Sequence, residues 1–113
     1  MDYDRSPLAF AEPETRDLYA KLLGALDSLG KFAEERKQTS VHLVRKSAFA
    51  GVHPRKKYLI VTVKAAEPIE SQRIFKTEQV SKSRWHCDLK LMAKSEIDAE
   101  LLGWLAKAYE ISG

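Results

Sequence analysis

The segment YLIVTVKA, residues 58–65, decides the fold of this chain. Successive side chains of a β-strand point to opposite faces, so Tyr58 and Ile60 would share one face and Leu59 and Val61 the other. Both faces are therefore apolar. A strand with two apolar faces is usually central in its sheet and covered on both sides. We predict a central strand here, with other strands beside it and helices packed on the sheet.

Two further strands are predicted just before this segment. Residues 40–46 read SVHLVRK and alternate, and residues 48–53 follow closely enough to form a tight hairpin with them. The basic turn HPRKK, residues 53–57, contains the breaker Pro54 and leads into the central strand.

Another strand is predicted at residues 85–91, WHCDLKL, where apolar and polar side chains alternate cleanly. Trp85 and Cys87 would share the core face. The other face would carry His86, Asp88 and Lys90. Adjacent residues on a strand point apart, so His86 and Cys87 are poorly placed to bind one ion.

Helices are predicted at both ends of the chain. Residues 14–30 carry a leucine stripe at helical spacing and end at Gly30, and residues 97–110 carry a second apolar stripe. Ser95 or Asp98 would cap the second helix. Between the elements, FAEERKQTS is interpreted as a charged connector, and QRIFKTEQV as a region that holds at most a short strand.

This order predicts an α+β, two-layer domain. Short links between strands favour a mostly antiparallel sheet of four to five strands, with one N-terminal and one C-terminal helix. Residues 1–12 are expected to form a leader with apolar anchors Leu8 and Phe10, and residues 13–113 a single domain. The predicted core contains Leu18, Leu22, Leu26, Leu43, Phe49, Leu59, Val61, Val63, Trp85, Leu89, Leu101, Trp104 and Leu105.

Composition excludes several classes of protein. No apolar run approaches the ~20 residues that a membrane-spanning helix needs. The polar, acidic start is unlike a signal peptide, and the chain has 1 cysteine, so no internal disulfide forms. These features predict a cytoplasmic protein that does not bind membranes.

Charge is distributed unevenly along the chain. Residues 36–94 carry 14 basic and 4 acidic side chains, a net charge of +10, while the total is +3. Such asymmetry indicates an anionic partner or a sheet kept soluble by exposed lysines. A nucleic-acid-binding domain is one alternative function, with phosphate contacts from Arg45, Arg55, Lys56, Lys57 and Arg84. Both predicted helices begin with acidic residues, which would repel the phosphates of a nucleic acid, so the helices are poor candidates for the contact.

Several motifs resemble a small bacterial family known as a domain of unknown function, number 5655. They are PETRDLY, LGK, VRKSAFAGVHPRKKYL, WHCDLKL and ELLGWLAKAY, in that order. The resemblance spans roughly residues 13–111. It implies a self-contained accessory domain, found alone or at the C-terminus of larger, sometimes restriction-related proteins. Some members carry the label "predicted transport protein". The resemblance implies no activity, cofactor or catalytic residue.

The leading hypothesis is a non-catalytic accessory domain that binds a protein partner or a small ligand, as a monomer or homodimer. The candidate ligand site is the polar face of the last strand and its neighbours: His86, Lys46, Tyr58, Asp88 and Lys90, with His42 able to join. A small enzyme with a site around His86 is the other alternative. No metal site and no cofactor are expected, because no histidine or cysteine pair has zinc-site spacing.

Overall fold

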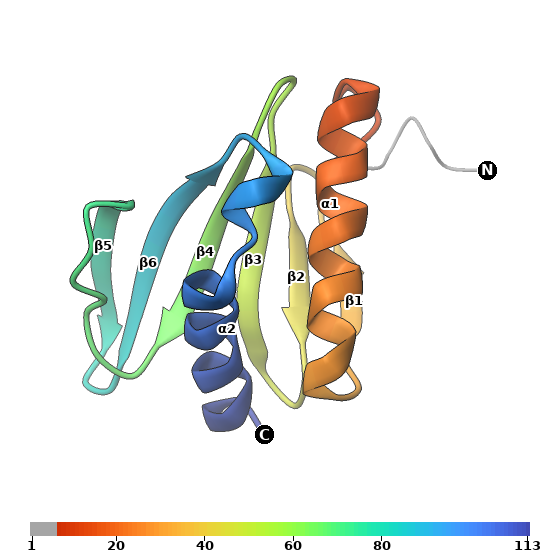
Figure 1. Ribbon diagram of the computed structural model, residues 1–113. Coiled ribbons are helices and arrows are strands. Elements are labelled where there is room, and N and C mark those ends of the chain that lie inside the picture. The colour runs from red at the N-terminus through yellow and green to blue at the C-terminus, as the bar shows by residue number, and fades with distance from the viewer. Residues whose placement is uncertain (1–6) are drawn as a thin grey trace.

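One antiparallel sheet and two helices make up the fold in the computed structural model, which describes residues 7–113. The six strands lie in the order β1-β2-β3-β4-β6-β5. Figure 1 shows both helices on the same side of the sheet, so the structure has two layers and the sheet has one face without a helix.

The strands are β1 (Ala33–Arg36), β2 (Val41–Val44), β3 (Ala48–Pro54), β4 (Leu59–Ala65), β5 (Ile74–Ser81) and β6 (Arg84–Leu91). The helices are α1 (Pro13–Leu26) and α2 (Ala99–Ile111), with short 3-10 turns η2 (Asp27–Leu29) and η3 (Lys94–Glu96). The α+β class, the antiparallel sheet and the two terminal helices are confirmed.

The sheet has six strands, so the prediction of four to five strands was too low. The added edge strand β1 reads AEER and is exposed throughout, so no apolar periodicity marks it. It forms because β2 offers a free edge, with Glu34 opposite Leu43. The hydroxyl of Tyr19 on α1 donates a 2.6 Å hydrogen bond to the Glu34 carboxylate, which ties this strand to the helix layer. The charged side chains of β1 also protect the sheet edge from pairing with other chains.

Both helices start at recognisable signals. Pro13 occupies the first turn of α1, where its missing N–H leaves no hydrogen bond unmade. The Asp98 carboxylate caps α2 by accepting from the Leu101 N–H at 3.0 Å, so Asp98, and not Ser95, is the cap of this helix. Ser95 lies in the preceding 3-10 turn.

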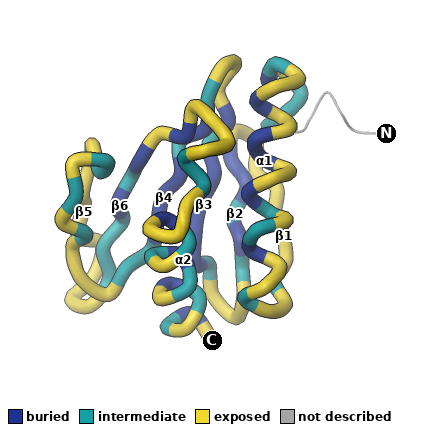
Figure 2. The backbone as a smooth tube through the Cα atoms, viewed as in Figure 1, coloured by how far each residue is buried: buried dark blue, intermediate teal, exposed yellow. Residues whose placement is uncertain are grey.

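The core lies between the sheet and the helices, where Figure 2 shows the buried segments of β2, β3 and β4 facing α1 and α2. Eleven residues of the predicted core are buried: Leu18, Leu22, Leu26, Leu43, Phe49, Leu59, Val61, Val63, Leu89, Leu101 and Leu105. The other two, Trp85 and Trp104, are half-buried. Trp104 still packs against the core cluster, as predicted, although part of its ring is exposed. Trp104 borders a hollow beside α2 and is therefore left partly open.

A β-bulge on β3 places Phe49 in the core. The pairing shifts from Leu43 opposite Ala50 to Val44 opposite Ala48, so Phe49 has no partner on β2. A bulge lets two consecutive side chains lean to the same side of the sheet. Phe49 and Ala50 are both buried as a result. From Ala50 onward β3 pairs regularly, so Val52 lies on the core side with Ala50, and Gly51 and His53 lie on the other side.

The described part of the leader lies against the helix layer. Leu8 packs against the core cluster, whereas Phe10 is 84% exposed and anchors little. The backbone N–H of Glu12 and the hydroxyl of Thr15 both donate to the carbonyl of Lys56, in the β3–β4 turn. In residues 7–113, no helix is long and apolar enough to cross a membrane.

Candidate functional site on the open face of the sheet

The sheet face without a helix carries a row of polar residues that crosses four strands. His42 on β2 lies opposite Gly51 on β3, Gly51 lies opposite Thr62 on β4, and Thr62 lies opposite Asp88 on β6. The Thr62 hydroxyl donates a 2.6 Å hydrogen bond to the Asp88 carboxylate. Alternation along each strand turns these side chains away from the apolar core.

Three histidines and one lysine gather around this row, and we call them the imidazole–lysine patch: His42, His53, Lys64 and His86. Its centre is Gly51, which has no side chain. A β-carbon at Gly51 would lie 3.8 Å from His53 Nε2 and 4.0 Å from His42 Cδ2, so both rings border this position. On β6, His86 lies directly opposite Lys64.

Lys64 is the cation of the patch. Its side chain is half-buried, and burial lowers the pKa of its ammonium group. Among the described residues, Lys64 forms no ion pair with a carboxylate. A partly desolvated charge without a partner is costly. Lys64 is therefore suited to meet an anion that approaches the open face.

All three histidines have lowered pKa values. Burial is the largest cause for each ring, and the charge of Lys64 lowers all three further. Nearby carboxylates oppose part of this shift. Asp88 raises the pKa of His53, Glu78 and then Asp88 raise that of His86, and Glu35 raises that of His42. The rings are consequently neutral at neutral pH, where each offers one hydrogen-bond donor and one acceptor.

Four of the five residues of the candidate ligand site lie along this face. His86, Asp88 and Lys90 share the open side of β6, and the ammonium of Lys90 lies 4.9 Å from the ring centroid of Tyr58. Lys46 is not with them. It lies in the β2–β3 turn, where its backbone N–H donates to the Ser112 carbonyl just after α2.

His53 and Lys64 are members of the patch that sequence reasoning missed. His53 read as part of the basic turn, although it is still within β3 and two residues from Gly51. Lys64 was not singled out within the predicted central strand, although it lies in β4. Alternation would have found Lys64, because Leu59 and Val61 point into the core and Lys64 therefore falls on the other face. It would not have found His53. With Phe49 in the core, strict alternation places Gly51 and His53 on the core side, and only the bulge at Phe49 turns them outward.

Two of the five candidate nucleic-acid contacts serve the end of α2 instead. Arg45 donates to the Tyr109 carbonyl at 3.1 Å, and its guanidinium lies 4.4 Å from the centroid of the Tyr109 ring. Arg84 donates to the Ile111 carbonyl at 3.1 Å. Cations at a helix C-terminus match its partial negative charge. The others, Arg55, Lys56 and Lys57, lie together in the exposed β3–β4 turn.

Metal-ligating groups do not converge in the part of the chain that the structure describes. No cluster of three or more histidine, cysteine, aspartate or glutamate side chains there could hold an ion. Cys87 is buried on the core face, opposite in direction to His86. The thiol is therefore a small apolar core group and has no role on the open face.

A protein family described as "Domain of unknown function (DUF5655)" matches residues 8–112. The chain belongs to this family. The region matched to DUF5655 includes both helices, the whole sheet and every residue of the imidazole–lysine patch. Comparison with curated proteins and with solved structures finds no match.

Proposed function

We propose that this DUF5655 chain is a non-catalytic accessory domain that binds an anionic group, a carboxylate or a phosphate, on the open face of its sheet. The single observation that carries the proposal is Lys64: a half-buried cation with no ion pair among the described residues, placed among three neutral imidazoles. An anion would relieve the desolvation of Lys64 and accept hydrogen bonds from the rings.

The shape of the patch supports a flat contact. The strands from β2 to β6 span three interstrand spacings, about 14 Å at about 4.8 Å each. A carboxylate or phosphate alone would cover the centre at Gly51. An acidic segment of a partner protein would also reach Tyr58 and Lys90 at the edge of the patch. The anion can thus belong to a small ligand or to a protein.

Other parts of the proposal are organisational. Residues 13–113 form the single domain, residues 1–12 the leader, and the protein works in the cytoplasm. Supporting the location, the one cysteine is buried and unpaired, as is usual in a reducing compartment.

A nucleic-acid-binding function is the second candidate, because residues 36–94 carry a net charge of +10. Its best surface is the exposed β3–β4 turn with Arg55, Lys56 and Lys57. Arg45 and Arg84 are already held by carbonyls at the end of α2, which leaves fewer arginines for phosphates.

The test is a titration followed by NMR of the imidazole C–H signals of the three patch histidines. The probes are inorganic phosphate, a peptide of eight glutamates, and a short DNA duplex. The decisive variant is Lys64→Met, and the matched control is Lys57→Met, which removes an exposed lysine of the β3–β4 turn. A charge-assisted hydrogen bond contributes about 1.5–3 kcal/mol. Half-exposure places Lys64 at the lower end, so its loss should weaken binding about tenfold.

The outcomes separate the candidates. Loss in Lys64→Met but not in Lys57→Met supports anion binding by the patch. Tighter binding of the peptide than of phosphate then indicates a protein partner, and equal binding indicates a small anion. DNA binding that is retained in Lys64→Met and weakened in Lys57→Met supports the nucleic-acid alternative. If none of the three probes shifts the histidine signals, the proposal is wrong.

A further inference from the structure

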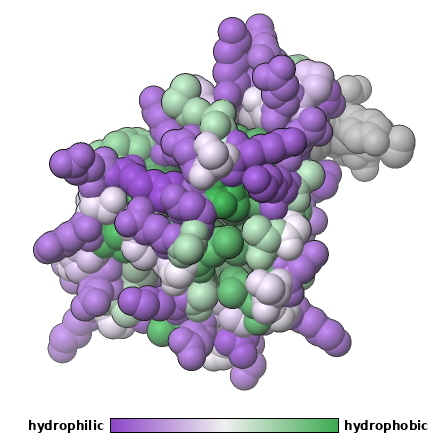
Figure 3. Space-filling model, in the orientation of Figure 1, coloured by the Kyte–Doolittle hydropathy of each residue, from purple (hydrophilic) through white to green (hydrophobic). Residues whose placement is uncertain are grey.

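A hollow of about 410 Å³ lies on the helix side, between α2 and the segment that follows β4. Its apolar lining includes Ile69, Trp104, Ala108 and Ile111. Small-molecule sites usually have volumes of ~300–1,000 Å³ and mostly apolar walls, so this hollow is of a suitable size and character. Figure 3, which views the helix side, shows hydrophobic side chains near the middle of this face with hydrophilic ones around them.

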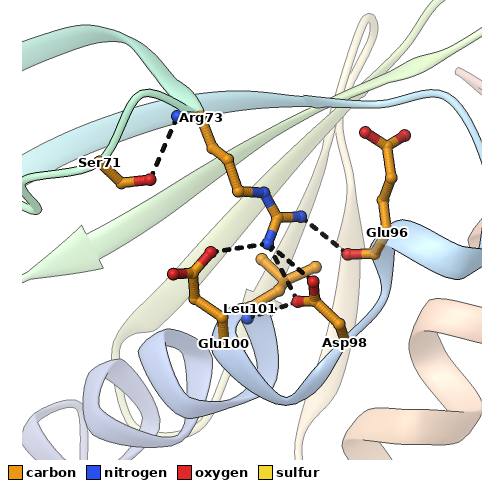
Figure 4. Close-up of polar contacts among 6 residues, drawn as sticks. All are labelled: Ser71, Arg73, Glu96, Asp98, Glu100 and Leu101. Carbon is orange, nitrogen blue, oxygen red and sulfur yellow. Dashed lines mark hydrogen bonds and ion pairs between the residues drawn. The ribbon is translucent and has the colours of Figure 1, made fainter.

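An ion-pair network centred on Arg73 contacts Trp104, which borders the hollow. Arg73 donates to the carboxylates of Asp98 at 3.0 and 3.2 Å and of Glu100 at 3.1 Å, and to the Glu96 carbonyl at 2.8 Å (Figure 4). These bonds fasten the chain before β5 to the start of α2. The Arg73 guanidinium also lies 5.6 Å from the ring centroid of Trp104. The Trp104 ring is therefore held in position before any ligand arrives.

The charged side chains at the rim are mostly acidic. Glu67 and Glu70 come from the segment after β4, Glu110 comes from α2, and Lys107 is the single cation of the lining. Residues 36–94 contain just 4 acidic side chains, and two of them stand at this rim. The charge of Arg73 is matched by Asp98 and Glu100, so it does little to offset the rim.

We propose that this hollow binds a small organic cation with an apolar body, an alkyl- or arylammonium compound. The apolar floor would take the hydrocarbon part. Trp104 offers the aromatic ring that attracts cations most strongly, and the rim carboxylates match the ammonium charge. The site is separate from the imidazole–lysine patch, which lies on the other face of the sheet, so this inference does not depend on the proposed function.

Three probes of nearly equal shape and different charge test the proposal: phenethylamine, 2-phenylethanol and 3-phenylpropionate. Binding is followed by NMR of the Trp104 indole N–H signal, because Trp104 borders the hollow. The imidazole C–H signals of His42 and His53, on the other face of the sheet, are the internal control. We expect the Trp104 signal to move and saturate, with the amine bound tightest and the carboxylate weakest. The two histidine signals should stay in place.

Three variants at exposed positions complete the test. Glu67→Gln with Glu70→Gln should weaken the amine about two- to fivefold for each carboxylate and leave the alcohol unchanged. Glu78→Gln on β5 is the matched control and should change nothing. Ala66→Trp, at the exposed lip, should block all three probes. Equal affinity for the three probes, or no shift of Trp104 at millimolar amine, would overturn the proposal.

Discussion

Replacing Gly51 with alanine tests the geometry of the imidazole–lysine patch most directly. The new methyl group would lie 3.8 Å from His53 Nε2, 3.8 Å from Thr62 Cβ and 4.0 Å from His42 Cδ2, all ordinary van der Waals distances. Among the described glycines, Gly30 is the one with positive φ, so alanine fits the backbone at Gly51 without strain. The substitution should therefore stabilise the protein.

The size of the effect follows from the unfolded chain. Alanine has fewer unfolded conformations than glycine, and a compatible Gly→Ala change raises the free energy of unfolding by about 0.4–1 kcal/mol. The entropy of unfolding near 60 °C is about 2.1 cal/mol/K per residue, or about 0.24 kcal/mol/K for 113 residues. Dividing the two gives a rise in Tm of about 2–4 °C for Gly51→Ala.

The assay is thermal unfolding followed by circular dichroism, with two glycine controls. Gly24 lies in α1 with open space around its Cα, so Gly24→Ala should also raise Tm. Gly30→Ala should lower it. Gly30 has φ 132°, and a β-carbon there would lie 2.5 Å from the Tyr109 hydroxyl oxygen, so the hydroxyl and its 2.9 Å bond to the Lys31 carbonyl must shift. Backbone strain alone costs about 1–3 kcal/mol.

A lower Tm for Gly51→Ala alongside a higher Tm for Gly24→Ala would refute this reasoning. It would show that His42 and His53 crowd Gly51 and leave no room at the centre of the patch. The larger change Gly51→Leu tests whether the patch binds phosphate. It should fill the centre and abolish phosphate binding in a protein that still folds.

Two further predictions concern titration and the sheet edge. Burial lowers the folded-state pKa values of His42, His53 and His86, so the unfolded chain binds more protons than the folded chain below about pH 6.5. The free energy of unfolding should therefore fall as the pH drops through about 6.5, whereas near pH 7.5 these histidines should no longer change it. Urea unfolding at several pH values measures this, and glutamine at all three positions should flatten the curve; an equal fall in that variant would contradict the assignment. Tyr19→Phe removes the 2.6 Å hydrogen bond to Glu34 and should lower the free energy of unfolding by about 1–2 kcal/mol. Amide hydrogen exchange should become faster in β1 than in β4. Unchanged exchange in β1 would show that this hydrogen bond does not hold the strand.

Elements with strong periodicity could be predicted from the sequence. The central strand, the strand at WHCDLKL and both helices were placed close to their observed bounds, because each buries one face or stripe in the core. Alternation also placed His86, Asp88 and Lys90 on the face away from Cys87. The local sequence pattern is enough for these predictions, because each needs only one helix or strand and the side of it that faces the core.

The edge strands were predicted poorly for the opposite reason: β1 was interpreted as a connector, and the region of β5 as holding only a short strand. β1 is charged at most positions and β5 is mostly exposed, so neither carries a periodic apolar pattern. Their extended conformation depends on hydrogen bonds to the neighbouring strand. The local sequence does not show which other segment of the chain will pair with them. The bulge at Phe49 is similar, since it depends on the pairing of β2 with β3.

By itself the sequence determined the two-layer class, the leucine-rich core and the direction in which His86 points. Only the tertiary structure decided which residues surround it. β6 returns beside β4 while β5 is displaced to the edge, and this strand order sets Lys64 opposite His86. The bulge at Phe49 shifts the alternation of β3 by one residue, so that Gly51 and His53 face outward. Register and strand order are collective properties of the whole sheet: a one-residue slip turns every side chain of a strand to the other face.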